Sequence, residues 1–215
     1  MSATLRISEI FYSLQGEART VGRPTIFIRL TGCPLRCQYC DTAYAFSGGI
    51  MYSLDDIIGE LKQYNTRYIT VTGGEPLAQP DCIALLNRLC EMNYEVSLET
   101  SGAMDVSAVD SRVVKVLDLK TPGSLEVKRN MESNIAFLNP HDQVKFVICS
   151  REDYLWSCEK VNEFKLGEKV ADILFSPSNE ELEAKELAEW ILADQLDVRM
   201  QVQLHKYLWG NESGH

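Results

Sequence analysis

Short apolar runs rich in β-branched residues recur along this chain of 215 residues, and they constrain its fold more than any other feature. The clearest are "TIFIRL" (25–30) and "YITVTGG" (68–74), which have the length and composition of buried strands. Further runs of the same kind are residues 94–100, 113–119, 143–149, 171–176 and 199–204. The sequence therefore predicts a sheet whose strands come from the whole length of the chain.

Helical patterns lie between several of these predicted strands. Ser53 and Asp56 form a capping-box pattern that opens one predicted helix, and Ser178 and Glu181 form a second such pattern. Residues 81–92 also carry apolar side chains at helical spacing. Alternation of strands and helices implies right-handed crossovers and a mainly parallel sheet. An open doubly wound sheet and a partial (β/α) barrel both fit this order, and periodicity does not choose between them.

Charge and hydropathy exclude several classes of protein. The formal net charge is −10, from 31 acidic and 21 basic residues, and no cluster of Lys and Arg stands out, so we expect no direct binding to nucleic acid. No apolar stretch approaches the roughly 20 residues that span a bilayer. The first residues contain no long apolar segment typical of a secretory signal. We therefore expect a cytoplasmic protein without a membrane partner.

Three cysteines, Cys33, Cys37 and Cys40, lie within one loop, "LTGCPLRCQYCDTAY" (30–44). Structural zinc takes four ligands, yet the next cysteine is Cys82, so a zinc site would need remote ligands. A 4Fe–4S cluster fits better, because three thiolates leave one iron open to another ligand. The loop follows the strand predicted at 25–30, and ligands gather at the carboxyl ends of parallel strands.

The spacing Cys-x3-Cys-x2-Cys, with Tyr39 before the last cysteine, resembles the signature of the radical S-adenosylmethionine enzymes. "VTGGEP" (71–76), after the second strong strand, resembles another motif of that family. The resemblance implies a 4Fe–4S cluster held by the three cysteines, with S-adenosylmethionine bound at the open iron. The adjacent glycines of "VTGGEP" would also let the backbone approach a ligand closely.

Motifs beyond the cysteine loop resemble the ring-contracting members of this family. These motifs are "SLQGE" (13–17), "ETSG" (99–102) and "HKYL" (205–208). The resemblance implies conversion of 6-carboxy-5,6,7,8-tetrahydropterin into 7-carboxy-7-deazaguanine with loss of ammonia, a step of 7-deazapurine biosynthesis of the queuosine type. It further implies a need for Mg²⁺, a homodimer, and a flavodoxin- or ferredoxin-like electron donor.

The same resemblance implies roles for individual residues. Those expected to contact the pterin are Leu14, Gln15, Gly16, Glu17, Arg29, Thr72, Glu99 and His205, of which His205 is also a candidate for a catalytic role. Those expected to contact S-adenosylmethionine are Tyr39, Gly74, Glu75, Ser101, Asp118, Lys120 and Ser176. Thr42 would bind Mg²⁺ through its hydroxyl, since Mg²⁺ keeps several waters and needs few protein ligands.

Arg29 interrupts the apolar strand predicted at 25–30, and a buried guanidinium needs a partner that accepts its hydrogen bonds. That partner is either a substrate carboxylate, held by two parallel hydrogen bonds, or another side chain in an ordinary ion pair.

The chain departs from its relatives at the C-terminus, where "WGNESGH" (209–215) follows "HKYL". Asn211 then holds the position at which many relatives end in a carboxylate, and Asn211 or Glu212 would have to replace that contact.

Two other functions use the same cysteines. One is an activating enzyme that forms a glycyl radical on a partner protein, and the other is a metal-binding scaffold without catalysis.

The resemblance, together with a length below the roughly 250 residues of a complete barrel, predicts an α/β fold. This fold is a partial and splayed (β/α) barrel of mainly parallel strands. We expect one domain over residues 1–215, with short N- and C-terminal elaborations.

Overall fold

The computed structural model describes residues 3–179, 181–210, 212 and 214. Its strands are β1 (Thr4–Leu14), β2 (Pro24–Leu30), β3 (Ile50–Ser53), β4 (Tyr68–Gly73), β5 (Glu95–Thr100), β6 (Val114–Asp118), β7 (Gln143–Ile148), β8 (Asp172–Pro177) and β9 (Arg199–Met200). Its helices are α1 (Leu54–Leu61), α2 (Cys82–Glu91), α3 (Arg151–Glu163), α4 (Ala184–Ala193) and α5 (Leu204–Trp209).

All of these strands join one sheet, in the order β3-β1-β2-β4-β5-β6-β7-β8-β9. From β2 to β9 every neighbouring pair is parallel, whereas β1 pairs antiparallel with both β2 and β3. The two end strands, β3 and β9, do not pair with each other, so the barrel stays open. The predicted partial barrel of mainly parallel strands is confirmed, with an antiparallel extension at its N-terminal side.

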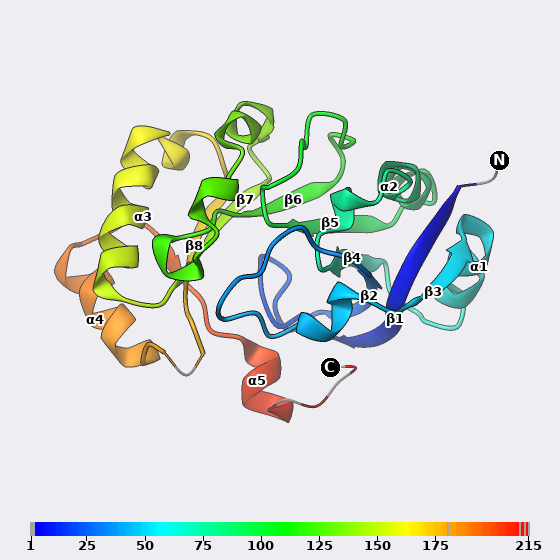
Figure 1. The fold of residues 1–215 in the computed structure, drawn as a ribbon, viewed down its shortest axis with the longest axis horizontal. Coiled ribbons are helices and arrows are strands. Elements are labelled where there is room, and N and C mark those ends of the chain that lie inside the picture. Colours follow the sequence, from blue (N-terminus) through cyan, green and yellow to red (C-terminus); the bar gives the residue numbers. More distant parts are fainter. Residues whose placement is uncertain (1–2, 180, 211, 213, 215) are drawn as a thin grey trace.

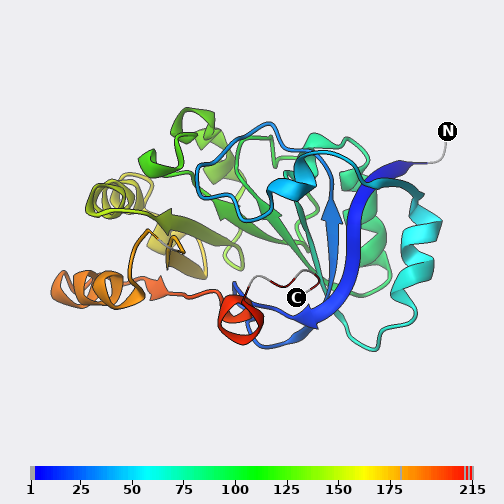
Figure 2. The ribbon, with the colours of Figure 1, turned by 60° about the horizontal axis from the view of Figure 1, so that its bottom comes forward.

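The helices cover the outer face of this curved sheet (Figures 1 and 2). α1 and α2 lie at the end of the sheet that contains β3 and β4, and α3 and α4 lie beside β7 and β8. α5 lies apart from them, on the open side of the barrel. None of the helices in the described residues is long and apolar enough to cross a membrane.

Alternating side chains along each strand separate an apolar face from a polar one. Ile69 and Val71 on β4 are buried in the apolar core under the helices, as are Val144 and Phe146 on β7. The intervening residues point to the concave side, which is where a ligand can enter. The period of two in the sequence therefore sets both the core and the lining of the interior.

The position of α4 differs from the sequence prediction. Ser178 and Glu181 do not open a helix, because α4 begins at Ala184 with Glu183 as its N-cap. Glu181 instead accepts a hydrogen bond at 3.0 Å from the side-chain amide of Gln38, in the cysteine loop. A long-range contact thus uses the carboxylate that the local pattern assigned to a cap.

Two further elements differ from the sequence pattern. The last predicted strand, 199–204, is reduced to the two residues of β9, and α5 begins at Leu204. α3 is not predicted by the pattern, because charged residues interrupt its apolar positions. The α1 prediction is confirmed: Ser53 and Asp56 form a reciprocal capping box.

A buried ion pair connects β6 to the residue that precedes β7. Lys115 and Asp142 are about 1% and 0% exposed, and their charged groups lie 2.8 Å apart. The Asp142 carboxylate also accepts hydrogen bonds from the backbone N–H groups of Lys115 and Asn139. Neither Lys115 nor Asp142 lines the interior cavity, so this pair serves the fold alone.

Lys115→Met tests that assignment. Removing one partner of a buried pair leaves an uncompensated charge, and we expect the free energy of unfolding to fall by about 3–5 kcal/mol. The melting temperature should drop by about 10 °C, since each kcal/mol shifts it by about 2–4 °C in a chain of this size. Thermal unfolding followed by circular dichroism measures the loss. A variant as stable as the wild type would contradict the role given to the pair.

Candidate active site

The concave face of the sheet encloses a cavity of about 780 Å³. This size lies within the range of small-molecule sites. Its wall is formed by residues that follow or end the parallel strands, among them Cys33 after β2, Gly74 after β4 and Ser101 after β5. The cavity therefore lies where ligands bind in parallel α/β architectures, as the sequence predicts.

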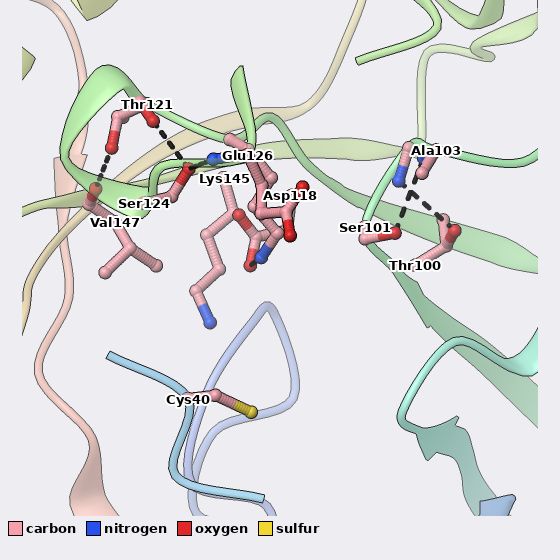
Figure 3. A network of polar contacts seen from close by, with 12 residues as sticks. Cys40, Thr100, Ser101, Ala103, Asp118, Thr121, Ser124, Glu126, Lys145 and Val147 are labelled. Atoms are coloured by element: carbon pink, nitrogen blue, oxygen red, sulfur yellow. Dashed lines mark hydrogen bonds and ion pairs between the residues drawn. The ribbon is translucent and has the colours of Figure 1, made fainter. Parts of the chain in front are cut away.

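Polar side chains from five neighbouring strands face this cavity. They are Thr70 and Thr72 on β4, Glu99 on β5, Asp118 on β6, Lys145 on β7 and Ser176 on β8. Figure 3 shows Asp118 and Lys145 on the face of the sheet that is turned towards the loop carrying Cys40. Strands that are remote in sequence thus form one charged floor.

The cysteine loop forms the opposite wall, and Cys33, Cys37 and Cys40 all line the cavity as half-buried free thiols. A backbone hydrogen bond from Gln38 to Ser124 anchors the loop, and Ser124 is held in turn by Thr121 (Figure 3). Burial raises the pKa of the Cys33 thiol and raises that of Cys37 to about 11. Metal coordination deprotonates a thiol outright.

Among the described residues, no three His, Cys, Asp or Glu side chains are already gathered as a metal site. The donor set nevertheless fits an iron–sulfur cluster, because Cys33, Cys37 and Cys40 share one loop and one cavity.

The glycines after β4 allow two loops to approach each other. A Cβ at Gly74 would lie 2.7 Å from Cys33 Cβ, and Gly73 has φ of +151°. The backbone N–H of Glu75 donates to the carbonyl oxygen of Gly32 at 2.8 Å. Glycine at these positions therefore brings the "VTGGEP" turn against the base of the cysteine loop.

Glu75 lies behind this turn, fully buried and outside the cavity wall. Its carboxylate accepts hydrogen bonds from the Thr100 hydroxyl and from the hydroxyl and backbone N–H of Ser101. The carboxylate that the resemblance assigns to S-adenosylmethionine is thus engaged inside the protein. These hydrogen bonds hold Ser101, which does line the cavity.

Several buried polar atoms in the cavity wall have no hydrogen-bond partner within the described residues. They belong to the Tyr39 hydroxyl, the Ser176 hydroxyl and Oδ1 of Asp118, all in residues that line the cavity. Lys120 pairs with the other oxygen of Asp118 at 2.9 Å. Buried polar atoms are nearly always satisfied, so these groups fit a polar ligand such as S-adenosylmethionine.

The same cavity is lined by the first segment predicted to contact the pterin. Leu14, Gln15, Gly16 and Glu17 all line it. The Gln15 side-chain amide donates to the Thr70 hydroxyl at 2.9 Å, which fixes the start of this segment against β4.

His205, from α5, packs directly on Gly16. A Cβ on Gly16 would overlap Nδ1 of the imidazole, and Leu204 N–H donates to the Gly16 carbonyl oxygen at 3.0 Å. Burial lowers the pKa of His205, an effect that the nearby Glu17 and Asp41 carboxylates partly oppose, so the imidazole is neutral at pH 7. The C-terminal segment is therefore part of the site.

Arg29 lines the cavity and also forms the ion pair that the sequence left open as an alternative. Its Nε lies 2.6 Å from Glu9 Oε1, and the Tyr44 hydroxyl donates to the same oxygen at 2.7 Å. Phe11 lies against the guanidinium, 5.6 Å from ring centroid to Cζ. Glu9 binds through Nε, so the contact with a substrate carboxylate predicted from the resemblance would use the two terminal nitrogens.

Thr42 lines the cavity beside the last cysteine, with its hydroxyl 3.9 Å from Cys40 Sγ. At the C-terminus, Glu212 lines the cavity, as do Gly210 and Gly214. Asn211, the other residue proposed to replace a terminal carboxylate, lies outside the described residues. Glu212 thus has the location that such a contact needs.

The carboxylic acid of Glu99 has an unusually high pKa. Burial raises its pKa to about 7; Lys145 opposes this rise, and the Glu17 and Asp118 carboxylates add to it. Arg29 is a second, weaker opposing charge. A group that titrates near neutral pH inside a cavity is typical of an active site.

The cavity residues that sequence reasoning missed include Lys145, Gln203 and Asp41, each of which carries charge or hydrogen bonds. Lys145 had a detectable signal, because it interrupts the apolar run "QVKFVIC" as Arg29 interrupts "TIFIRL". Gln203 and Asp41 had none, since polar residues in loops are common.

A family model described as the radical SAM superfamily matches residues 27–191. The open barrel, the three-cysteine loop and this match define the class of protein: a radical S-adenosylmethionine enzyme, which uses a 4Fe–4S cluster and S-adenosylmethionine. Among curated proteins, the 7-carboxy-7-deazaguanine synthase of Chlorobaculum tepidum is 42% identical, over 98% of this chain and 97% of that protein. The one from Koribacter versatilis is 39% identical, over 97% and 99%. The chain belongs to the 7-carboxy-7-deazaguanine synthase family.

Solved structures support the fold. QueE from Escherichia coli superposes with a TM-score of 0.70 at 22% identity, covering 93% of this chain and 94% of that one. SuiB from Streptococcus suis, bound to S-adenosylmethionine, gives a TM-score of 0.56 at 13% identity, with 83% of this chain covered and 48% of SuiB. At these identities the likeness concerns the fold alone.

Gly16→Ala tests the contact between the "SLQGE" segment and α5. The new methyl group would overlap the His205 imidazole and push the C-terminal segment outwards. We expect KM for the pterin to rise about tenfold, in keeping with the 1–3 kcal/mol of an overpacked contact. Steady-state kinetics measure it, and Gly59→Ala, at a site where a Cβ meets nothing within 4 Å, is the control. Equal KM values for both variants would contradict the contact.

Proposed function

We propose that this chain converts 6-carboxy-5,6,7,8-tetrahydropterin into 7-carboxy-7-deazaguanine with loss of ammonia, in 7-deazapurine biosynthesis of the queuosine type. One observation carries the proposal: a single cavity joins the cysteine loop to a floor and wall suited to a carboxylated pterin. The family relationship, over nearly the whole chain, supports the same reaction.

At one end, Cys33, Cys37 and Cys40 would hold the 4Fe–4S cluster. Around it, S-adenosylmethionine would contact the residues whose polar groups or backbone face that end, namely Tyr39, Gly74, Ser101, Asp118, Lys120 and Ser176. When bound, the cluster and S-adenosylmethionine together supply the radical that abstracts hydrogen from the substrate. The protein's task at this end is to hold these groups and to exclude water.

At the other end, Gln15 and Glu17 would bind the polar edge of the pterin, and Arg29 its carboxylate. Leu14, Gly16, Thr72, Glu99 and His205 would complete the wall. Because Glu99 titrates near neutral pH, it is suited to hold or release a proton at the substrate. Thr42 would bind Mg²⁺, with the substrate carboxylate as a further ligand.

Other features belong to the same proposal. The enzyme would act in the cytoplasm as a homodimer, receive electrons from a flavodoxin- or ferredoxin-like protein, and form one domain over residues 1–215. The net charge of −10 supports the absence of direct nucleic-acid binding.

Cysteine variants test the cluster assignment. After anaerobic reconstitution with iron and sulfide, the wild type should be brown and, once reduced, should convert the pterin. Cys33→Ala, Cys37→Ala and Cys40→Ala should each abolish turnover, because each removes one of three thiolates. Cys158→Ala, a free cysteine outside the cavity, is the matched control.

Two results would contradict the proposal in different ways. Cleavage of S-adenosylmethionine without conversion of the pterin would favour an activating enzyme that acts on a protein. A reconstituted protein that does not cleave S-adenosylmethionine at all would favour a metal-binding scaffold.

Thr42→Val tests the magnesium assignment. Valine keeps the shape of threonine but removes the hydroxyl, the one protein ligand proposed for Mg²⁺. We expect the Mg²⁺ concentration for half-maximal turnover to rise at least about tenfold, as when metal affinity loses a supporting group. A Mg²⁺ titration of pterin turnover measures this, and the iron content should stay unchanged. An unaltered Mg²⁺ response would exclude Thr42 as a ligand.

A further inference from the structure

Lys145 is a charged cavity residue to which the proposed function assigns no role. It lies on β7, about 8% exposed, among apolar neighbours in sequence. Its ammonium forms an ion pair with Oε2 of Glu17, which lies in the loop between β1 and β2. The two residues are separated by 128 positions in sequence, so only the fold brings them together.

The ion pair restrains the Glu17 carboxylate from one side, and Gln203 restrains it from the other. The Gln203 side-chain amide donates to Oε1 of Glu17 at 2.7 Å. It also lies 3.3 Å from Oδ2 of Asp41, the residue before Thr42. The Glu17 carboxylate therefore joins the sheet to the C-terminal segment, and Gln203 extends this link to the end of the cysteine loop.

Within the part of the chain that the structure describes, each oxygen of this carboxylate receives one hydrogen bond. A carboxylate offers about four acceptor positions, so Glu17 retains capacity to accept from a ligand. Without Lys145 the carboxylate would rotate, and its burial would be opposed by desolvation. Burial raises the pKa of Glu17, but Lys145 and the hydrogen bond from Gln203 outweigh this effect and lower it overall.

Other carboxylates face the same ammonium. Glu99 on β5 and Asp118 on β6 both act on Lys145, and with Glu17 they raise its pKa despite the opposing effect of burial. Lys145 is therefore permanently charged, which makes it a poor proton donor and a good fixed counter-ion. This argues for a role in placing charge, as opposed to transferring a proton.

We propose that Lys145 is a positioning residue for substrate recognition: it fixes the Glu17 carboxylate so that this group accepts two hydrogen bonds from the ligand. The ligand edge that matches is an amino-pyrimidinone, whose ring N–H and exocyclic amino group donate side by side. Lys145 acts through Glu17 and does not touch the substrate. The inference deepens the proposed function and rests on it.

A double-mutant cycle on pterin KM separates indirect from direct action. We expect Glu17→Gln and Lys145→Met each to raise KM at least about tenfold, the scale of a lost charge-assisted hydrogen bond. In the Glu17→Gln background, Lys145→Met should add little, because the carboxylate it positions is gone. Multiplicative effects, or an unchanged KM in Lys145→Met, would overturn the proposal.

Two readouts distinguish positioning from a merely structural role. The pH profile of kcat/KM should shift to higher pH, because Glu17 and Glu99 lose a positive neighbour. The charges that still face them are Arg29 near Glu99, the Asp118 carboxylate with Lys120 beside it, and Asp41 near Glu17, which is repulsive. Lys145→Arg should restore most of the affinity.

Lys115→Met is the matched control, a buried lysine on the neighbouring strand whose partner does not line the cavity. It should lose stability while keeping the pterin KM.

If Lys145→Met does not fold, a second double-mutant cycle uses Gln203→Leu, which removes the other restraint on Glu17. The effects of Gln203→Leu and Glu17→Gln on KM should again be non-additive. Additive effects in that cycle would overturn the proposal. A wild type that does not convert the pterin would overturn the proposed function itself, whereas a converting wild type with an additive cycle would overturn this inference alone.

Discussion

The alternation of side chains along parallel strands is the constraint on which this structure depends. Helices cover one face of the sheet, so side chains such as Ile69 and Phe146 are buried in an apolar core. The other face is left concave, and side chains such as Thr70 and Lys145 point into it. Since the period is two, a shift of any strand by one residue would exchange core and cavity. Stability and ligand binding are thus set by the same register.

Charge in the cavity follows from this geometry. Acidic residues from separate strands lie together at the floor, and burial alone would leave them protonated or unstable. Lys145 and Lys120 are the buried cations that offset them. Glu99, which has no direct ion pair among the described residues, is the carboxylate whose pKa rises to about 7. One chain can in this way hold a fixed anion, Glu17, beside a group that exchanges protons.

Much of the fold was predictable because its signals are local. β2, the strands from β4 to β8, α1 and α2 appear where apolar periodicity and capping residues place them. The start of α4 was not predictable, since Glu181 binds Gln38 across the molecule and does not close a cap. β9 and α5 also depend on tertiary context, because the segment around His205 is held by its contact with Gly16. A local pattern cannot anticipate which distant partner competes for a side chain.

By itself, the sequence determined the chemistry: three cysteines at one strand end, the glycines that let a second loop approach them, and motifs typical of one family. The tertiary structure decided how the charged groups divide the work. It placed Glu75 behind the cavity wall as a support for Ser101, and it paired Lys145 with Glu17. The physical reason is that spacing along a chain fixes which face a residue occupies, whereas ion pairing depends on the distance between strands that only folding brings together.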